Sequence, residues 1–240
     1  MPMRLDKFLA DCGAGTRSEV KKLIKSGAVC VIGLDKVSPD TKIDEKSSEV
    51  YLNGEPIGYK KYVYLMLNKP ENCLSATQDR YKTVVTDFVP PEFKHFDVFP
   101  IGRLDIDTVG LCILTNDGGL AHRLLSPARH IPKAYLAEVD GELSDDDIRA
   151  FESGMDLGDF ITKPSRLEII SASEDKSLAK VTIFEGKFHQ IKRMFKDRGR
   201  EVTYLKRIAM NRLLLDGNLS EGEIRELTTD ELELLTYDTE

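Results

Sequence analysis

The sequence has little that would place it in a membrane or outside the cell. None of its apolar runs reaches the roughly 18 residues that a membrane-spanning helix needs. The first residues, MPMRLDKFLADCG, are charged and helix-like, unlike the apolar centre of a secretory signal. Cysteines are few and show no C-x-x-C spacing, so we expect reduced, mostly buried thiols in a cytoplasmic protein: Cys12, Cys30, Cys73 and Cys112.

Signatures of bound cofactors are also missing. The sequence contains no P-loop, no G-x-G-x-x-G turn and no G-x-S-x-G elbow. Its histidines follow no metal-ligand spacing: His95, His122, His130 and His189. We therefore expect neither a cofactor nor a metal.

Positive charge is in deficit overall but is concentrated locally. Against 41 Asp and Glu there are 34 Lys and Arg, and the formal net charge of −7 by itself argues against a nucleic-acid partner. From Lys187 to Arg212, however, nine basic residues face two acidic ones, whereas residues 216–240 carry nine acids and one arginine. Phosphate binding depends on local potential, so the basic segment is compatible with RNA. We expect the acidic segment to be a solvated surface.

Residues 1–58 are predicted to form a small αβ domain. Apolar residues spaced three and four apart predict a helix that stops at Gly13. The segment 16–27 predicts a second helix, with Thr16 as N-cap, and 28–32 and 48–54 predict short strands. The Gly- and Pro-containing stretch NGEPIGYKK (53–61) is then expected to be a linker.

The second predicted helix carries a basic stripe. Arg17, Lys21 and Lys25 repeat every four residues, with Lys22 beside them, opposite an apolar face. Such a stripe is either an ordinary solvated face or a surface that contacts RNA phosphates. Composition alone favours the solvated face.

Residues 59–240 are predicted to form a larger α+β domain. Periodicity and turn residues predict strands over 62–70, 109–116 and 134–141, helices over 118–127 and 143–154, a hairpin formed by 166–173 and 178–186, and a basic helix over 189–199.

One carboxylate stands where chemistry is plausible. In GRLDIDTVGLCILTNDG (102–118), Asp105 follows Arg103 and precedes a strand predicted to be fully buried. It is either a structural salt bridge at the strand entrance or a nucleophile kept ionised by a cation, for which Lys192 and Arg193 qualify by charge. Asp107 would make a carboxylate pair with Asp105, but two acids two residues apart are only a weak indication of a glycosidase.

Five segments together resemble one family. GRLDIDTVGLCILTNDG resembles the active-site motif of pseudouridine synthases of the RsuA type, and KAYLAEV (133–139) resembles their K-x-Y motif. EGKFHQIKRMF (185–195) and NKPENCLSATQD (68–79) resemble two further motifs, and RLDKFLADCGAGTRSEVKKLIKSGAVCV resembles an S4 RNA-binding domain. The order and spacing cover almost the whole chain.

This resemblance implies a fold and a set of roles. The fold would be an N-terminal S4-like αβ domain followed by a catalytic domain with a mixed, mainly antiparallel sheet and flanking helices. Asp105 would be the nucleophile, Tyr135 would lie against the target uracil, and Lys192 would hold Asp105. Leu205 would lie under the ring, and Arg103 would fill the space left by the flipped base. The remaining RNA contacts would be Arg17, Lys21, Lys22, Lys25, Lys187, His189, Gln190, Arg193 and Lys196.

The implied activity is isomerisation of one uridine in ribosomal RNA by a cytoplasmic monomer acting on a ribosome assembly intermediate. The compact length and TKPSRLEII (162–170) look more like members that act on 16S small-subunit rRNA. The same reaction on 23S large-subunit rRNA is the alternative. An inactive S4-type RNA-binding or ribosome-assembly protein is an alternative of a different class. Whether Asp105 attacks the sugar, attacks the base or assists a glycal route stays open.

Overall fold

The structure, a computed structural model, describes residues 2–237. The chain divides into two compact units, Met1–Val63 with Pro90–Asp97, and Tyr64–Val89 with Val98–Glu240. Within the described residues, no helix combines the length and the apolarity needed to cross a membrane.

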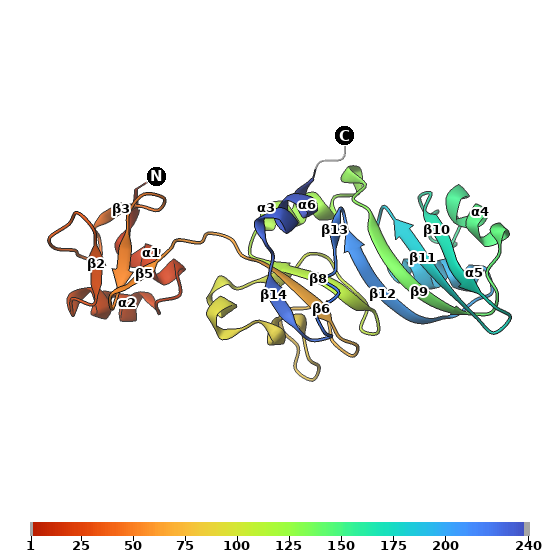
Figure 1. The fold of residues 1–240 in the computed structure, drawn as a ribbon, viewed down its shortest axis with the longest axis horizontal. Helices are drawn as coiled ribbons and strands as arrows, with labels where there is room; N and C mark the ends of the chain where they lie inside the picture. The colour runs from red at the N-terminus through yellow and green to blue at the C-terminus, as the bar shows by residue number, and fades with distance from the viewer. Residues whose placement is uncertain (1, 238–240) are drawn as a thin grey trace. The chain divides into compact units, whose positions relative to one another are not determined.

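The first unit packs two helices on two small sheets (Figure 1). Its helices are α1 (Leu5–Asp11) and α2 (Arg17–Lys25), and a 3-10 helix η2 (Pro91–Phe96) is grouped with it. Its strands are β1 (Pro2–Arg4), β2 (Val29–Val31), β3 (Lys42–Asp44), β4 (Val50–Leu52) and β5 (Glu55–Ile57). Strand β1 pairs with β3, and β2, β4 and β5 form an antiparallel sheet.

Local sequence explains the start of α2. The backbone N–H of Glu19 donates to Thr16 Oγ1, and the Glu19 carboxylate accepts from the backbone of Thr16 in return, as the sequence predicted. Val20 and Ile24 face the core of this unit. The basic stripe on the opposite face is exposed.

Two sequence predictions for this unit need correction. Residues 55–57 are not linker but strand β5, because the Asn53–Gly54 turn, with both residues at positive φ, folds the chain back onto β4. Cys30 is exposed on β2, although Cys73 and Cys112 are buried as expected and all four cysteines are free thiols.

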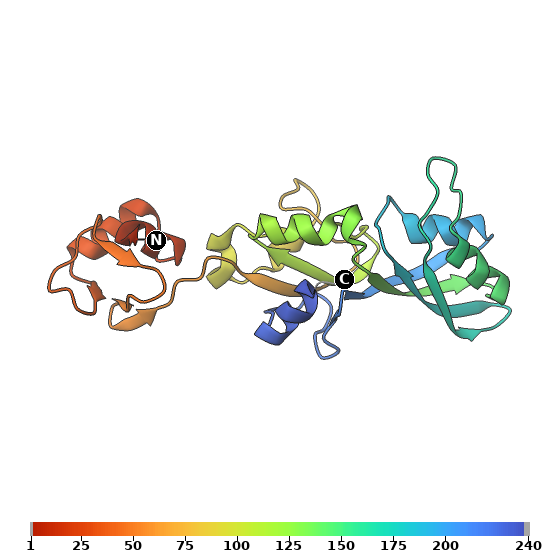
Figure 2. The same ribbon diagram turned by 90° about the horizontal axis from the view of Figure 1, so that it is seen from above.

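The second unit is built on one large sheet (Figure 2). Its strands are β6 (Tyr64–Lys69), β7 (Phe99–Pro100), β8 (Val109–Thr115), β9 (Lys133–Asp140), β10 (Arg166–Ala172), β11 (Lys176–Ile183), β12 (Val202–Met210), β13 (Leu213–Leu214) and β14 (Ile224–Glu226). Its helices are α3 (Gly118–Leu125), α4 (Asp145–Ser153), α5 (Gln190–Asp197) and α6 (Thr229–Thr236), with 3-10 turns η1 (Val85–Phe88) and η3 (Pro127–Arg129).

The strand order is β10-β11-β9-β12-β8-β6-β14, with β13 beside β12 and β7 beside β8. Of the pairs in the described sheet, β8 with β12 is parallel and the others are antiparallel. The predicted α+β class with a mixed, mainly antiparallel sheet is confirmed. All seven residues of β8 are buried, and the predicted hairpin is β10 with β11.

Strand β12 was not predicted, although it lies between β9 and β8. Its sequence interrupts the apolar alternation with Lys206 and Arg207, and Arg207 is nevertheless 2% exposed. The backbone comes close to β8 here. A Cβ on Gly110, whose φ is +98°, would lie 2.3 Å from the Arg207 carbonyl oxygen, so only glycine fits.

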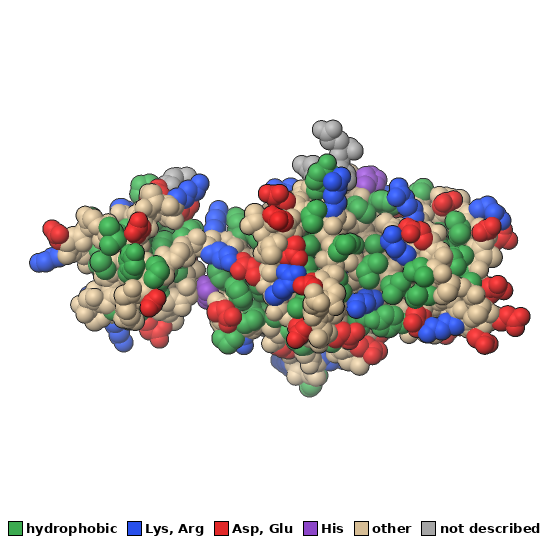
Figure 3. Space-filling model, in the orientation of Figure 1, with side chains coloured by type: hydrophobic (Ala, Val, Ile, Leu, Met, Phe, Trp, Pro, Cys, Tyr) green, Lys and Arg blue, Asp and Glu red, His purple; other side chains and the backbone are tan. Residues whose placement is uncertain are grey.

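The acidic C-terminal segment is more than the solvated surface that its composition suggested. Strand β14 pairs with β6, and Leu235 of α6 is fully buried. Arg225 forms ion pairs with Asp216 and Glu231. On the face drawn in Figure 3, acidic and basic side chains of the second unit are interspersed. Pairing with Arg225 therefore lets part of this acidic segment fold against the sheet.

Candidate active site

The loop that carries Asp105 is held by the strands around it. It connects β7 to β8, which pair with each other, so residues 101–108 must turn back within a short span. The buried Lys69, at the end of β6, donates through Nζ to the carbonyl oxygens of Thr108 (2.9 Å) and Ile106 (3.3 Å). Burial lowers the pKa of the Lys69 ammonium.

A second contact fixes the residue directly before Asp105. The backbone N–H of Leu104 donates to Ser75 Oγ at 2.9 Å. The Ser75 hydroxyl in turn donates to the Leu104 carbonyl oxygen at 2.9 Å. Leu104 is itself buried. Asp105 therefore extends from a backbone held on both sides, which suits a group that must be rigid.

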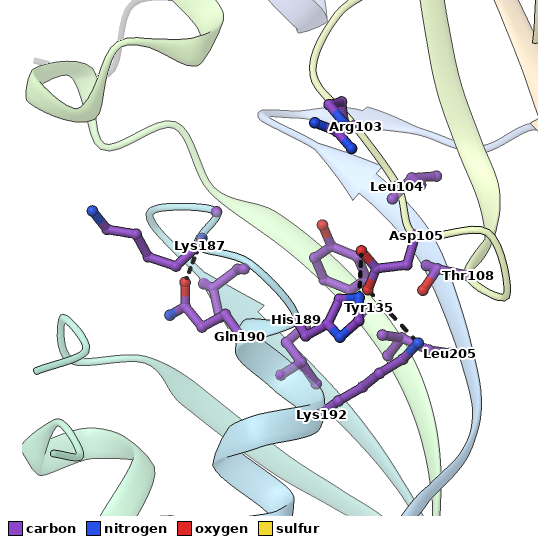
Figure 4. A pocket seen from close by; sticks show the side chains of 13 residues that line it. Arg103, Leu104, Asp105, Thr108, Tyr135, Lys187, His189, Gln190, Lys192 and Leu205 are labelled. Atoms are coloured by element: carbon purple, nitrogen blue, oxygen red, sulfur yellow. Dashed lines mark hydrogen bonds and ion pairs between the residues drawn. The ribbon is translucent and has the colours of Figure 1, made fainter. Parts of the chain in front are cut away.

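Helix α5 brings cations to this loop. The turn before it places His189 in the left-handed region (φ 51°), and the buried amide of Gln190 braces the turn. Gln190 accepts from the backbone N–H of Lys187 (3.0 Å) and donates to the Glu185 carboxylate (3.0 Å). In the first turn of the helix, Lys192 points toward the loop (Figure 4).

Asp105 and Asp107 share the Lys192 ammonium. Lys192 Nζ lies 3.7 Å from Asp105 Oδ2 and also donates to Asp107 Oδ1. His189 Nε2 lies 3.6 Å from Asp105 Oδ1, on the other oxygen of the carboxylate (Figure 4). Partial burial acts to raise the pKa of Asp107, but the hydrogen bond and the charge of Lys192 lower it by more.

Strands β9 and β12 supply the apolar wall. Tyr135 (7% exposed) and Leu205 (5% exposed) come from these neighbouring strands and line the same pocket as Asp105. The cavity at the centre of this pocket has a volume of about 70 Å³. The pocket combines a carboxyl group, a lysine and an aromatic ring, which can hold a flat base beside a carboxylate. The other lining residues are Arg103, Leu104, Thr108, Ile183, Gly186, Lys187, His189, Gln190, Ile191 and Lys192.

Most predicted catalytic-domain residues meet at this pocket, but three of them lie differently from the rest. Arg103 is exposed at its rim. Arg193, the alternative cation for Asp105, instead pairs with Asp159 and donates to the Leu157 carbonyl oxygen at 3.0 Å. Lys196 is exposed on α5 and does not line the pocket.

Gln190 and Lys187, both predicted to contact RNA, differ in their exposure. Gln190 is 3% exposed, and its side-chain amide is bonded to Lys187 and Glu185. The predicted contact of Gln190 with RNA is therefore corrected to a structural role. Lys187 is exposed, with its Nζ 5.8 Å from the centre of the Phe160 ring. Arg17, Lys21, Lys22 and Lys25 belong to the first unit and are exposed.

Sequence reasoning missed the groups that hold the site. Lys69 and Ser75 were quoted within a motif but received no role, and Thr108 was not singled out. The signal that could have identified Lys69 is a lysine at the end of an apolar strand before Pro70, where a charge must be either exposed or satisfied. Ser75 bonds only to backbone, which leaves no signature in the sequence.

Comparison with known proteins agrees with this geometry. Residues 63–197 match the family described as RNA pseudouridylate synthase, and residues 3–31 match the S4 domain. The chain is 47% identical over 234 residues to the RNA pseudouridine synthase YtzG of Bacillus subtilis, which covers 97% of this chain and 98% of that protein.

Relatives named for either ribosomal subunit are about equally similar. Ribosomal large subunit pseudouridine synthase B of Bacillus subtilis is 38% identical, over 97% of this chain and 95% of its own. Ribosomal small subunit pseudouridine synthase A of Vibrio parahaemolyticus is 36% identical, over 96% and 98%. A crystal structure of a pseudouridylate synthase aligns with a TM-score of 0.68 at 35% identity, over 98% of this chain and 100% of that one. The chain therefore belongs to the RNA pseudouridine synthases, isomerases of uridine in RNA, and carries an N-terminal S4 domain.

Proposed function

We propose that this RsuA-type enzyme converts one uridine of 16S small-subunit ribosomal RNA to pseudouridine, with Asp105 as the nucleophile. The single observation that carries the assignment of Asp105 is its place in the pocket, between Lys192 and His189 and near the ring of Tyr135. Residues 1–58 would serve as the S4-like RNA-binding domain and residues 59–240 as the catalytic domain. The protein would work as a cytoplasmic monomer on a ribosome assembly intermediate.

The reaction breaks the N1–C1′ bond of uridine, turns the base and joins its C5 to C1′. No electrons are gained or lost overall. The chain must therefore supply a nucleophile, a means of holding the detached base and shielding from water. Asp105, whose carboxylate lies 3.7 Å from the Lys192 ammonium, would supply the first. Tyr135 and Leu205 would hold the base.

The target base must leave the RNA stack to enter this pocket. Arg103, exposed at the rim, would occupy the space that the base leaves. Lys187, His189, Arg193 and Lys196 would contribute positive potential for the neighbouring phosphates, with Arg193 already engaged by Asp159.

The small-subunit assignment is supported by the resemblance of residues 162–170 to small-subunit enzymes. The identities to relatives named for the two subunits, 36% and 38%, favour neither. Large-subunit rRNA is accordingly the second candidate substrate.

Mapping pseudouridine in both rRNAs from cells with and without the gene tests this proposal. We expect one 16S position to lose pseudouridine on deletion and to regain it with the wild-type gene but not with Asp105→Asn. Loss of pseudouridine at a 23S position instead would identify large-subunit rRNA as the substrate. An unchanged map in both rRNAs would rule out rRNA modification and favour an inactive assembly factor.

A further inference from the structure

The segment between Ser75 and Val84 presents an aromatic ring that does nothing for the fold. Tyr81 is 92% exposed, the highest value among the large apolar or aromatic side chains that the structure describes as exposed. It is flanked by Arg80 and Lys82, both exposed. In Figures 1 and 2 this segment projects from the second unit as a narrow loop. The order Arg-Tyr-Lys thus places one ring between two cations.

The tip of this loop is held in shape by its own hydrogen bonds. The carboxylate of Asp79 accepts from the backbone N–H of Tyr81 and of Lys82, each at 2.9 Å. These bonds lower the pKa of Asp79 and keep its acceptor ionised. Thr86 Oγ1 donates to the Thr77 carbonyl oxygen at 2.9 Å, which closes the loop farther down. The exposed ring is therefore presented on an ordered turn.

The base of the loop is joined to the active site. Leu74 donates to the Thr83 carbonyl oxygen (2.9 Å) and accepts from the backbone N–H of Val85 (3.0 Å). The next residue, Ser75, makes the two bonds to Leu104 described above, and Leu104 lines the pocket beside Asp105. The loop therefore begins close to the pocket.

We propose that Arg80, Tyr81 and Lys82 form an RNA-docking tip. The ring of Tyr81 stacks on an unstacked base of the RNA outside the pocket, and the two cations bind the phosphates beside it. Aromatic rings interleaved with cations are the usual means by which proteins hold unpaired nucleotides. The inference rests on the proposed RNA substrate but assigns a recognition site beyond the motifs of the catalytic pocket.

The absence of tryptophan from the chain makes a direct test possible. Tyr81→Trp, made in the Asp105→Asn background so that the RNA is not converted, gives a protein with one tryptophan at the tip. The probe is rRNA from the deletion strain. We expect its binding to change the tryptophan fluorescence and to reduce quenching by acrylamide severalfold. Ile170→Trp in the same background, on the exposed edge strand β10 (57% exposed), is the matched control and should not respond.

Side-chain replacement gives the second measurement. Tyr81→Ala should weaken rRNA binding roughly 10-fold, whereas Tyr81→Phe, which keeps the ring, should stay within about 2-fold. Arg80→Ala with Lys82→Ala should flatten the dependence of log K on log salt. An unprotected tryptophan on RNA-bound protein, or wild-type affinity of Tyr81→Ala, would overturn the docking tip and favour a protein partner for the loop.

Failure of this inference is distinguishable from failure of the proposed function. If a gene-dependent pseudouridine is found but the fluorescence of Tyr81→Trp does not respond to RNA, only the docking tip is contradicted. A protected tryptophan without any gene-dependent pseudouridine would keep the tip and remove the rRNA substrate.

Discussion

Asp105 and Asp107 are two carboxylates that compete for one ammonium. Lys192 makes its shorter contact with Asp107, while Asp105 also has His189 at 3.6 Å and faces the pocket. This arrangement suggests a division of roles. Asp107 would fix Lys192, and Asp105 would remain available to react.

Replacing the two carboxylates separately tests that division. Asp105→Asn should abolish isomerisation and leave RNA affinity within about 3-fold, because the amide keeps the shape but is not a nucleophile. Asp107→Asn should lower the single-turnover rate far less. Turnover by Asp105→Asn near the wild-type rate, or a greater loss of rate in Asp107→Asn, would contradict the assignment of Asp105 as the nucleophile.

The role of Lys192 can be read from a pH profile. Lys192→Met removes the charge that lowers the pKa of Asp107, so the carboxylate pair should bind its first proton at higher pH. We expect single-turnover rates to fall roughly 100-fold and the acid limb of the profile to move upward. Arg193→Met is the control, because Arg193 is engaged by Asp159, and its acid limb should not move. If the acid limb of the pH–rate profile does not move in Lys192→Met, a group other than Lys192 lowers the pKa of the carboxylate pair.

At the residue scale, a family resemblance in the sequence named candidate reacting groups, and the structure brings Asp105, Tyr135 and Lys192 together at one pocket. Charge alone could not separate Lys192 from Arg193. The structure separates them because adjacent helix positions point about 100° apart, so that one faces the loop and the other faces Asp159. Lys69 and Ser75 escaped prediction because their partners are backbone oxygens and N–H groups of residues distant in the sequence.

Two helices of the second unit are locked together by one ion pair. Arg198, directly after α5, donates through Nε to Asp147 Oδ1 at 2.9 Å. The other oxygen of Asp147 accepts from the backbone N–H of Ser144 at 3.0 Å, at the start of α4. The Asp147 side chain is 4% exposed. The end of α5, the helix that bears Lys192, is thereby tied to the start of α4.

This pair makes stability depend on pH. Burial acts to raise the pKa of Asp147, but the bonds from Arg198 and Ser144 lower it by more. A carboxyl group whose folded pKa is depressed contributes fully above its unfolded pKa of about 4, and the contribution is lost as pH falls through the folded value. We expect Asp147→Asn to lose about 2 kcal/mol in urea unfolding at pH 7.

Below pH 4 the difference between Asp147→Asn and wild type should shrink, since wild type then loses the same interaction. Asp146→Asn, at a solvated position of the same helix turn, should unfold like wild type at both pH values. A difference between Asp147→Asn and wild type that stays constant from pH 7 to pH 3 would contradict the assigned role.

Elements with strong local signals were predictable, and those defined by tertiary burial were not. The N-cap of α2, Thr16, and the apolar run of β8 were predicted from the sequence. Strand β12 was missed because Arg207 is buried, donating through Nε to the Leu111 carbonyl oxygen at 2.6 Å. The alternation of polar and apolar residues in a sequence does not distinguish a buried arginine from an exposed one.

For the whole molecule, the expected contribution of the first unit is affinity. Replacing Arg17, Lys21 and Lys25 by Ala should weaken rRNA binding and flatten the salt dependence of log K by roughly one unit or less per side chain, because fewer counterions are released. The single-turnover rate at saturating RNA should stay nearly unchanged. Binding titrations across a salt series would show this, and identical slopes would mean that the stripe is only a solvated face.

The parallel pairing of β12 with β8 has a consequence for how the protein is made. Lys192 meets Asp107 across 85 residues of chain, and Arg207 meets Leu111 across 96. Contacts of such sequence separation close late, after the entropy of a long loop has been lost. During synthesis, Asp105 emerges well before the strand and helix that complete its surroundings. A nascent chain therefore cannot complete the pocket that Asp105 lines until β12, which supplies Leu205, has left the ribosome.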